Sequence, residues 1–299
     1  MNPAELALYP FERPGTLDEL CRTLSARAGR REKTVLLAGG TDWIVERRIG
    51  PPEDPNDLPL VLDVSRLAEL RGIKVAREIA TIGAAATFLE IRNHAVLSRR
   101  APLLTAMARE VGAVQIQARG TLGGNLASAS PAADGAAALV ALDADVVLAS
   151  IHGERRVPLT QFFTAYRTTR RAEDEVIVRI EFALPRTGAH QVWRKVGTRV
   201  AQAISKVAFA GIAEVERGRG VRAGFGMASV APVTVSLPSV RTLGLATSLA
   251  SVSDDELDAA VRRDISPIDD LRSTASYRAH VACALVKGFF RDIRMTAGA

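Results

Sequence analysis

The sequence predicts an α+β protein of two domains, and three observations support this prediction. The chain has 299 residues, which is long enough for two domains of ordinary size. Segments with the hydrophobic spacing of helices and of strands occur throughout, and in the C-terminal part the strand candidates precede the helix candidates. The regular pattern breaks at residues 184–188, where we place the domain boundary.

The N-terminal half contains several helix and strand signals. Thr16 and Glu19 form a capping-box pattern, and Leu17, Leu20 and Leu24 form an apolar stripe, so a helix is predicted that stops at Gly29. Strands are predicted at residues 35–37, 60–64 and 79–82, a second capping box at 87–90, a helix at 102–111 and a hairpin at 145–151 and 157–159. This half therefore mixes helices with strands.

The C-terminal part separates its strands from its helices. Strands are predicted at residues 192–196, 203–215 and 221–230. Helices follow, one opened by residues 253–256 and a last one spanning about 276–290. This order predicts an α+β second domain.

Composition and charge exclude several classes of protein. Hydrophobic residues make up 47% and charged residues 24%, as in globular proteins. We expect no membrane span and no signal peptide, and hence a cytoplasmic location. The cysteines, Cys21 and Cys283, are far apart, so a disulfide, a zinc site or a cysteine-held cluster is not expected. The charge of +6 comes from scattered arginine pairs without aromatic neighbours, which favours solvated faces, or an acidic partner, over nucleic-acid binding.

Two segments are rich in glycine and poor in bulky side chains. Residues 38–42 (Ala-Gly-Gly-Thr-Asp) follow a predicted buried strand, and residues 121–134 begin Thr-Leu-Gly-Gly-Asn and precede an apolar run. Such segments let a ligand approach the backbone closely, but a tight turn before a buried helix fits the second one equally well. Neither segment is GxGxxG or a Walker A loop, which disfavours an ordinary Rossmann or P-loop protein.

Taken together, the two segments resemble the paired flavin motifs of the FAD-binding medium subunits of molybdenum hydroxylases, the xanthine dehydrogenase and carbon monoxide dehydrogenase group. Three further segments match in the same order: residues 162–169 with 175–177, residues 194–196 with 205–207, and residues 269–278. The resemblance implies an FAD-binding domain of the vanillyl-alcohol-oxidase and p-cresol-methylhydroxylase type at residues 1–185, with subdomains at about 1–58 and 59–185. It implies a smaller α+β C-terminal domain at residues 189–299.

The resemblance also implies the flavin contacts. Backbone N–H groups of the first segment would face the pyrophosphate, the second segment would form the facing wall, and Asp134 would bond the adenosine ribose or nearby polar atoms. Val111 and Gly112 match an adenine-side contact, and Ile177 and Lys195 match positions near the adenine or the ring system. The complete set is Leu36, Leu37, Ala38, Gly39, Gly40, Thr41, Asp42, Trp43, Val111, Gly112, Thr121, Leu122, Gly123, Gly124, Asn125, Asp134, Ile177 and Lys195.

The implied role is electron transfer. Such a subunit carries FAD, takes electrons from [2Fe–2S] clusters on a small partner and passes them to an acceptor such as NAD or quinone. A large partner holds the molybdopterin cofactor, and the assembly is a heterotrimer or a dimer of heterotrimers. Some members carry a [4Fe–4S] cluster in an insertion, which is absent after Asn125, so no cluster is expected in this chain.

Other roles for these residues stay open. Asp42 or Asp134 could cap a helix, Lys195 could be a solvated charge, and Trp43 and Tyr166 could pack in the core. We find no acid–base pair, no nucleophile triad and no histidines at metal-ligand spacing, so neither a catalytic residue nor a metal site is predicted. An FAD-free interaction protein or a self-contained flavin oxidase remain the alternative functions.

Overall fold

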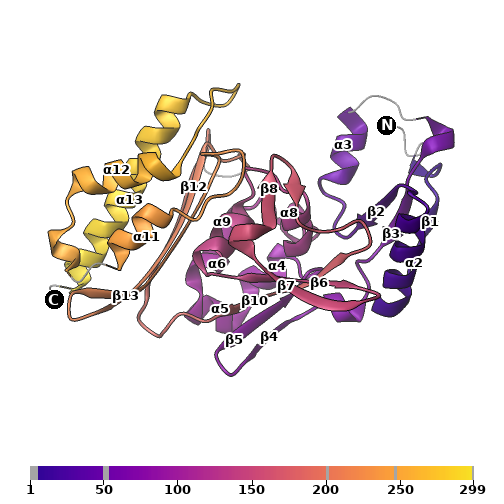
Figure 1. Ribbon diagram of the computed structural model, residues 1–299, viewed down its shortest axis with the longest axis horizontal. Coiled ribbons are helices and arrows are strands. Elements are labelled where there is room, and N and C mark those ends of the chain that lie inside the picture. Colours follow the sequence, from indigo (N-terminus) through magenta and orange to yellow (C-terminus); the bar gives the residue numbers. More distant parts are fainter. Residues whose placement is uncertain (1–5, 50–53, 200–201, 246–247, 298–299) are drawn as a thin grey trace.

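The structure is a computed structural model and describes residues 6–49, 54–199, 202–245 and 248–297 (Figure 1). It divides into three layers along its longest axis, each built on its own sheet. The α+β prediction is confirmed by this mixture of helices and sheets and by its likeness to solved structures reported below. Among the described residues, no helix is both long enough and apolar enough to cross a membrane.

The N-terminal layer is a three-stranded parallel sheet with helices beside it. The strands are β1 (Phe11–Glu12), β3 (Leu60–Asp63) and β2 (Thr34–Leu37), in that spatial order, with α2 (Leu17–Gly29), α3 (Trp43–Ile49) and two 3-10 turns (Pro55–Asp57, Ala68–Leu70). Helix α2 begins as predicted, since the Thr16 side chain accepts a bond from Glu19 N and Leu20 and Leu24 are buried. The Glu19 carboxylate, however, accepts from Gly15 N.

The subdomain boundary expected near residue 58 falls just before a strand of the N-terminal sheet. Strand β3 pairs in parallel with β2 from Thr34–Leu60 to Leu37–Asp63, and it therefore belongs to the N-terminal sheet. Buried β3 lies between β1 and β2 and satisfies its backbone groups by pairing with both. The N-terminal sheet therefore extends to Asp63.

The middle layer is a five-stranded antiparallel sheet with helices around it. Its strands are β4 (Ile73–Ala76), β5 (Ile79–Gly83), β10 (Val176–Ala183), β6 (Asp145–Ser150) and β7 (Gly153–Pro158), in that spatial order. The helices are α4 (Phe88–Asn93), α5 (Ala95–Arg100), α6 (Pro102–Glu110), α7 (Val114–Gln117), α8 (Leu122–Ala127), α9 (Asp134–Ala141) and α10 (Leu159–Phe162), with a small hairpin of β8 (Phe163–Ala165) and β9 (Thr168–Thr169). Thr87 and Glu90 form the predicted capping box.

The C-terminal layer is a long antiparallel meander covered by helices on its outer face (Figure 1). It contains β11 (His190–Val196), β12 (Val207–Glu216) and β13 (Arg219–Ala228), then α11 (Pro238–Gly244), a 3-10 turn (Leu249–Ser251), α12 (Asp254–Asp264) and α13 (Ala275–Ala297). Buried phenylalanines of β12, β13 and α13 contact one another in the core of this layer. The order of strands before helices matches the prediction.

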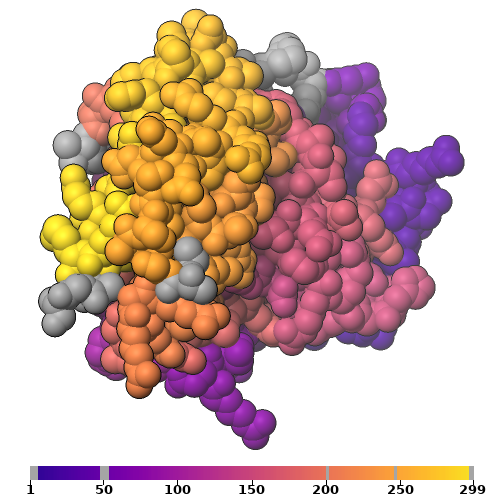
Figure 2. Space-filling view, turned by 60° about the vertical axis from the view of Figure 1, so that its left-hand side comes forward, coloured from indigo at the N-terminus to yellow at the C-terminus, as the bar shows by residue number. Residues whose placement is uncertain are grey.

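The C-terminal layer and the middle layer meet through α9. Cβ atoms at Gly224 and Gly226 of β13 would lie 2.1 and 2.0 Å from the carbonyl oxygens of Ala141 and Ala137 in α9. Glycine in the strand and alanine in the helix thus allow the two backbones to approach closely. In the space-filling view, the two layers join along a continuous seam, and the N-terminal layer lies beyond the middle one (Figure 2). Helix α9 therefore links the second glycine segment to the C-terminal sheet.

Candidate functional site

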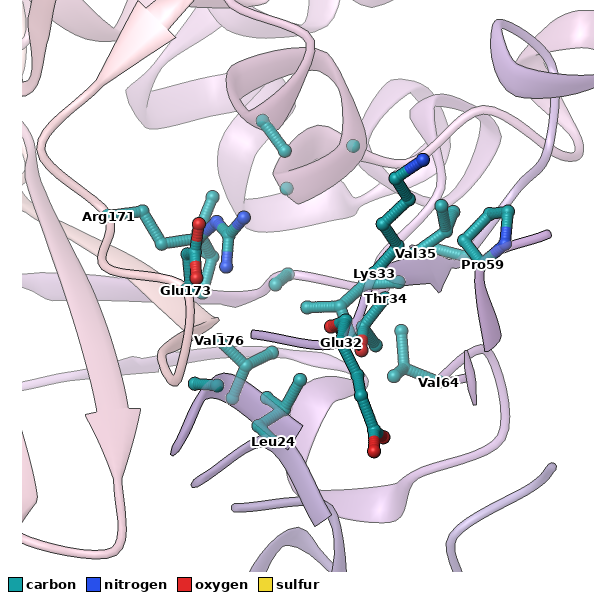
Figure 3. A pocket seen from close by; sticks show the side chains of 18 of the residues that line it. Leu24, Glu32, Lys33, Thr34, Val35, Pro59, Val64, Arg171, Glu173 and Val176 are labelled. Carbon is teal, nitrogen blue, oxygen red and sulfur yellow. Dashed lines mark hydrogen bonds between the residues drawn. The ribbon is translucent and has the colours of Figure 1, made fainter. Parts of the chain in front are cut away.

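A cavity of about 990 Å³ lies between the N-terminal and middle layers. Strand β2 and the end of α2 form one side, and α8 and the start of β10 form the other (Figure 3). Five residues of the predicted set line it, and they come from β2, both glycine segments and β10: Leu36, Ala38, Gly123, Gly124 and Ile177. The volume is at the upper end of the range for small-molecule and cofactor sites.

The segment 38–42 leads from β2 to α3 and offers unused backbone donors. Within the described residues, no protein acceptor is hydrogen-bonded to the N–H groups of Gly39, Gly40 or Thr41. Gly40 has a φ of +73°, a conformation that other residues resist. A Cβ atom at Gly39 would lie 2.0 Å from the carbonyl oxygen of Arg119, so this segment contacts the chain just before the second glycine segment.

Residues 122–127 of the second glycine segment form the short helix α8, where the sequence suggested a loop or turn. The Thr121 side chain accepts a bond from Gly124 N and caps α8, and Gly123 N donates to Ala84 O at 2.8 Å. A Cβ atom at Gly123 would lie 2.6 Å from the Ala84 Cβ, whereas at Gly124 the near contact would be the Thr121 hydroxyl, at 2.8 Å. The missing side chain at Gly123 therefore permits α8 to pack against Ala84. At Gly124 it leaves a bare wall, a stretch of backbone without a side chain that faces the cavity.

A buried charged cluster lies where α6, α9 and β11 meet. Lys195 Nζ donates to Asp134 Oδ2 at 2.5 Å and to Glu110 O at 3.1 Å, and both side chains of the ion pair are less than one tenth exposed. Burial raises the pKa of Asp134 to about 6, against the opposing effect of the Lys195 charge, and Glu110 adds to the rise. Asp134 Oδ1 and Asn125 Oδ1 are buried with no hydrogen-bond partner among the described residues. Such atoms would be satisfied by a bound polar group.

The contacts in this cluster exclude two alternative roles that the sequence had left open for Asp134 and Lys195. Ala133, not Asp134, is the N-cap of α9, and Asp134 makes no side-chain cap bond. Lys195 is not a solvated charge, because its side chain is buried and ion-paired. Nor does Asp134 line the cavity, so its assignment to the adenosine ribose has no support from the geometry.

The other residues of the predicted set lie around these two places. Val111 and Gly112 follow directly on Glu110, Leu122 is fully buried in the core, and Trp43 contacts Tyr9 edge to face at 5.2 Å. Its Nε1 is buried without a partner among the described residues. Tyr166 is 63% exposed, so its expected core role is wrong.

Asp42 lies immediately before α3 and close to the β8–β9 hairpin. Burial and the neighbouring Glu46 raise the pKa of Asp42, while Arg167 and a bond from Ser128 oppose the rise. Arg167 Nη1 also donates to Glu46 Oε1 at 2.6 Å. This ion pair connects the hairpin of the middle layer to α3 of the N-terminal layer.

Arg171 is a residue at the cavity that the sequence did not indicate. It belongs to one of the arginine pairs expected on solvated faces, yet it lines the cavity together with Glu173. Burial lowers the pKa of Arg171, and nearby acidic residues offset this only in part. No local signal identifies it, because its position depends on how β10 joins the sheet.

Comparison with known proteins identifies the family. The family described as "FAD binding domain in molybdopterin dehydrogenase" matches residues 6–186, and that described as "CO dehydrogenase flavoprotein C-terminal domain" matches residues 193–293. The chain belongs to this flavoprotein family. The expected resemblance is thereby confirmed, and the chain is an FAD-binding subunit of an oxidoreductase of the molybdenum hydroxylase type.

Individual relatives agree with this assignment. The FAD-subunit of nicotinate dehydrogenase from Eubacterium barkeri is 34% identical over 67% of this chain and 66% of its own length. The carbon monoxide dehydrogenase medium chain of Hydrogenophaga pseudoflava is 30% identical over 84% of this chain and 86% of its own length. A solved structure of carbon monoxide dehydrogenase from the same organism, lacking the Mo-pyranopterin moiety of its cofactor, has a TM-score of 0.83, with 25% identity over 93% of this chain and 94% of that one.

The residues present suit the FAD of this family. The free N–H groups of segment 38–42 are suited to an anion, as in other backbone anion sites. The bare wall at Gly124 and the cavity beside it leave room for an extended ligand. The unpaired buried oxygens of Asn125 and Asp134 are suited to hydrogen-bond donors.

Proposed function

We propose that this flavoprotein is the electron-transfer subunit of a molybdenum hydroxylase complex. In this proposal it receives electrons from [2Fe–2S] clusters on a small partner subunit and delivers them to an acceptor such as NAD or quinone. Substrate is hydroxylated at a molybdopterin centre on a large partner. One observation carries the proposal: within this family fold, the chain combines a cavity, free backbone donors at residues 39–41 and a buried charged cluster.

The proposed orientation of FAD follows from the chemistry of the three parts. The cavity residues would hold the adenosine half, the N–H groups of Gly39, Gly40 and Thr41 would hold the pyrophosphate, and Asn125 and Lys195 would border the isoalloxazine ring. Asp134 is thereby reassigned from the adenosine ribose to the ring end, because it is paired with Lys195. Val111 and Gly112 lie beside Glu110 and would border the same end.

The protein residues bind and orient the flavin, and the flavin supplies the redox chemistry when it is bound. The Lys195–Asp134 pair places a positive charge and a carboxylate in a buried site, where electrostatic effects on a ligand are large. Glu110 O and Asp134 hold the Lys195 ammonium in place. We assign the chain no acid–base residue for an organic substrate.

The partner subunits are part of the proposal. Relatives are named as FAD-subunit and medium chain, which supports a large and a small partner and a heterotrimer, alone or as a dimer. We propose the domain division 1–185 and 189–299, supported by the separate sheets and by a second core built only from residues after 189. We also propose a cytoplasmic location, supported by two buried free cysteines.

The proposal is tested on the purified 299-residue chain. We expect a flavin absorption spectrum and the release of FAD on denaturation. Gly124→Phe should abolish flavin retention while the circular dichroism spectrum stays unchanged, because a side chain there projects from the bare wall. A folded wild-type chain that stays colourless with added FAD would support the FAD-free alternative instead.

A second measurement separates the relay from a self-contained oxidase. The isolated flavoprotein should be reduced by a chemical donor but should not turn over organic substrates on its own. Co-purification of a molybdopterin chain and an iron–sulfur chain from the native host is expected. Substrate-dependent turnover by the isolated chain would contradict the relay.

A further inference from the structure

Arg171 is a partly buried cation at the cavity, and the nearby acidic residues Glu175, Glu173 and Asp174 stabilise its charge only in part. Its Nη1 donates to the backbone oxygens of Glu175 and Ala172 at 2.7 and 3.0 Å. Among the described residues, no carboxylate forms an ion pair with it. The rest of its guanidinium group is therefore available to a ligand.

The carboxylate of Glu175, the acidic residue whose backbone oxygen Arg171 contacts, is already bonded to other donors. The carboxylate of Glu175 accepts from Arg155 Nη2 and from Ala172 N, both at 2.7 Å. Burial alone would raise the pKa of Glu175, but these bonds outweigh burial and lower it. Arg155 thus neutralises the buried carboxylate of Glu175 from outside, and Arg171 stays as an unpaired cation on the cavity side.

The surroundings of the Arg171 guanidinium suit a flat aromatic ring better than a second phosphate. Arg171 extends into the cavity from one side, and Thr34 and Val35 of β2 lie on the other (Figure 3). Leu24 and Val176, both 2% exposed, line the same part of the cavity. The free backbone donors that suit a pyrophosphate belong to a different segment, residues 39–41.

We propose that Arg171 is a specificity residue that binds the adenine end of the dinucleotide. Its planar guanidinium lies against the purine ring, while Leu24 and Val176 supply apolar contacts. This makes the chain select flavins that carry an adenosine moiety over mononucleotide flavins. The inference rests on the proposed FAD function.

The test measures ADP, FMN and FAD binding to the full-length apoprotein by isothermal titration calorimetry. ADP carries the adenosine half alone, and FMN carries the ring half with one phosphate. Arg171→Ala should weaken ADP binding about tenfold and leave FMN binding within about twofold of wild type. FAD binding should weaken by the same factor as ADP binding.

Arg155→Ala is the matched control. Arg155 holds the same turn, through Glu175 and Arg170 O, but does not line the cavity. It should lower the melting temperature without changing the ratio of ADP to FMN affinity. Arg171→Lys, which keeps the charge but not the plane, should recover less than half of the lost ADP affinity on a logarithmic scale.

Several outcomes would overturn the inference. Unchanged ADP binding in Arg171→Ala would overturn it, and so would an equal loss of FMN binding, which indicates a phosphate contact. An ADP loss in Arg155→Ala as large as that in Arg171→Ala would show a purely structural role. A wild-type chain that binds neither FAD nor ADP would overturn the proposed function itself, whereas intact wild-type binding with an unaffected variant overturns this inference alone.

Discussion

The two glycine segments look alike in sequence, but they use their backbone groups in opposite ways. In segment 38–42 the amides of Gly39 and Gly40 have no protein acceptor among the described residues, and the segment is open to a ligand. In segment 121–134 the amides of Gly123 and Gly124 are bonded to Ala84 O and Thr121 Oγ1. One segment presents donors, and the other is a packed wall backed by the Asp134–Lys195 pair. The first segment thus keeps its glycine amides free although Gly39 packs closely on Arg119, whereas the second uses its glycine amides within the protein and packs closely at Gly123.

The largest effect is expected from breaking the ion pair behind the wall. Lys195→Met leaves Asp134 buried without its partner, which costs about 3–5 kcal/mol of unfolding free energy at pH 8. Urea unfolding of the apoprotein measures this loss. Arg194→Met is the control, since the neighbouring Arg194 is exposed, and it should change stability by less than about 0.5 kcal/mol.

The same variant should show a pH dependence. Folded Asp134 has a pKa of about 6, whereas the ordinary pKa of an aspartate is 3.8. Between these two pH values the folded state holds a proton that the unfolded state has lost, so the unfolding free energy falls as pH rises. The Lys195 charge lowers this pKa, so removing it moves the window upward. Lys195→Met should therefore be less destabilised at pH 5 than at pH 8. An equal loss of unfolding free energy at pH 5 and at pH 8 would contradict the raised pKa of Asp134.

Gly39→Ala tests the open segment. A Cβ atom there would lie 2.0 Å from the backbone oxygen of Arg119, which no side-chain rotation can relieve. We expect a loss of about 3 kcal/mol and of FAD retention, measured by thermal unfolding and by flavin absorbance. Gly29→Ala, where a Cβ atom would meet nothing within 4 Å, should leave both unchanged.

Gly123→Ala tests the packed wall. Its Cβ atom would come within 2.7 Å of the Ala84 backbone oxygen, and we expect a loss of about 2 kcal/mol of unfolding free energy. Gly288→Ala in α13, where a Cβ atom has open space, should instead stabilise by about 0.5–1 kcal/mol. Similar values for the two helical glycines would contradict the packing role of Gly123.

Gly124→Ala should have the smallest effect on stability. The added methyl group meets only the Thr121 hydroxyl, which can rotate, and the gain in helix propensity offsets the weakened cap. We expect an unfolding free energy within about 0.5 kcal/mol of wild type by urea titration. A loss comparable to that of Gly123→Ala would mean that both glycines serve packing.

Much of the site was predictable because its signals are local. The side-chain-poor segments, the capping residues Thr87 and Ser253 and the long C-terminal strands are each written within a few consecutive residues. Asp134 and Lys195 were singled out individually, but their pairing was not predicted, because they lie 61 positions apart. Arg171 was missed altogether, since an arginine on the surface and one at a cavity look the same in sequence.

The sequence by itself indicated the family, the α+β class and many of the longer helices and strands, because caps, glycines and hydrophobic periodicity act over short distances. Only the tertiary structure decided that β3 completes the N-terminal sheet and that β10 lies between β5 and β6. It also decided that residues 122–127 of the second glycine segment form a helix packed on Ala84, while the first segment keeps its donors free. These features depend on which distant segment supplies the partner for each buried backbone group, and that is settled only when the whole chain packs together.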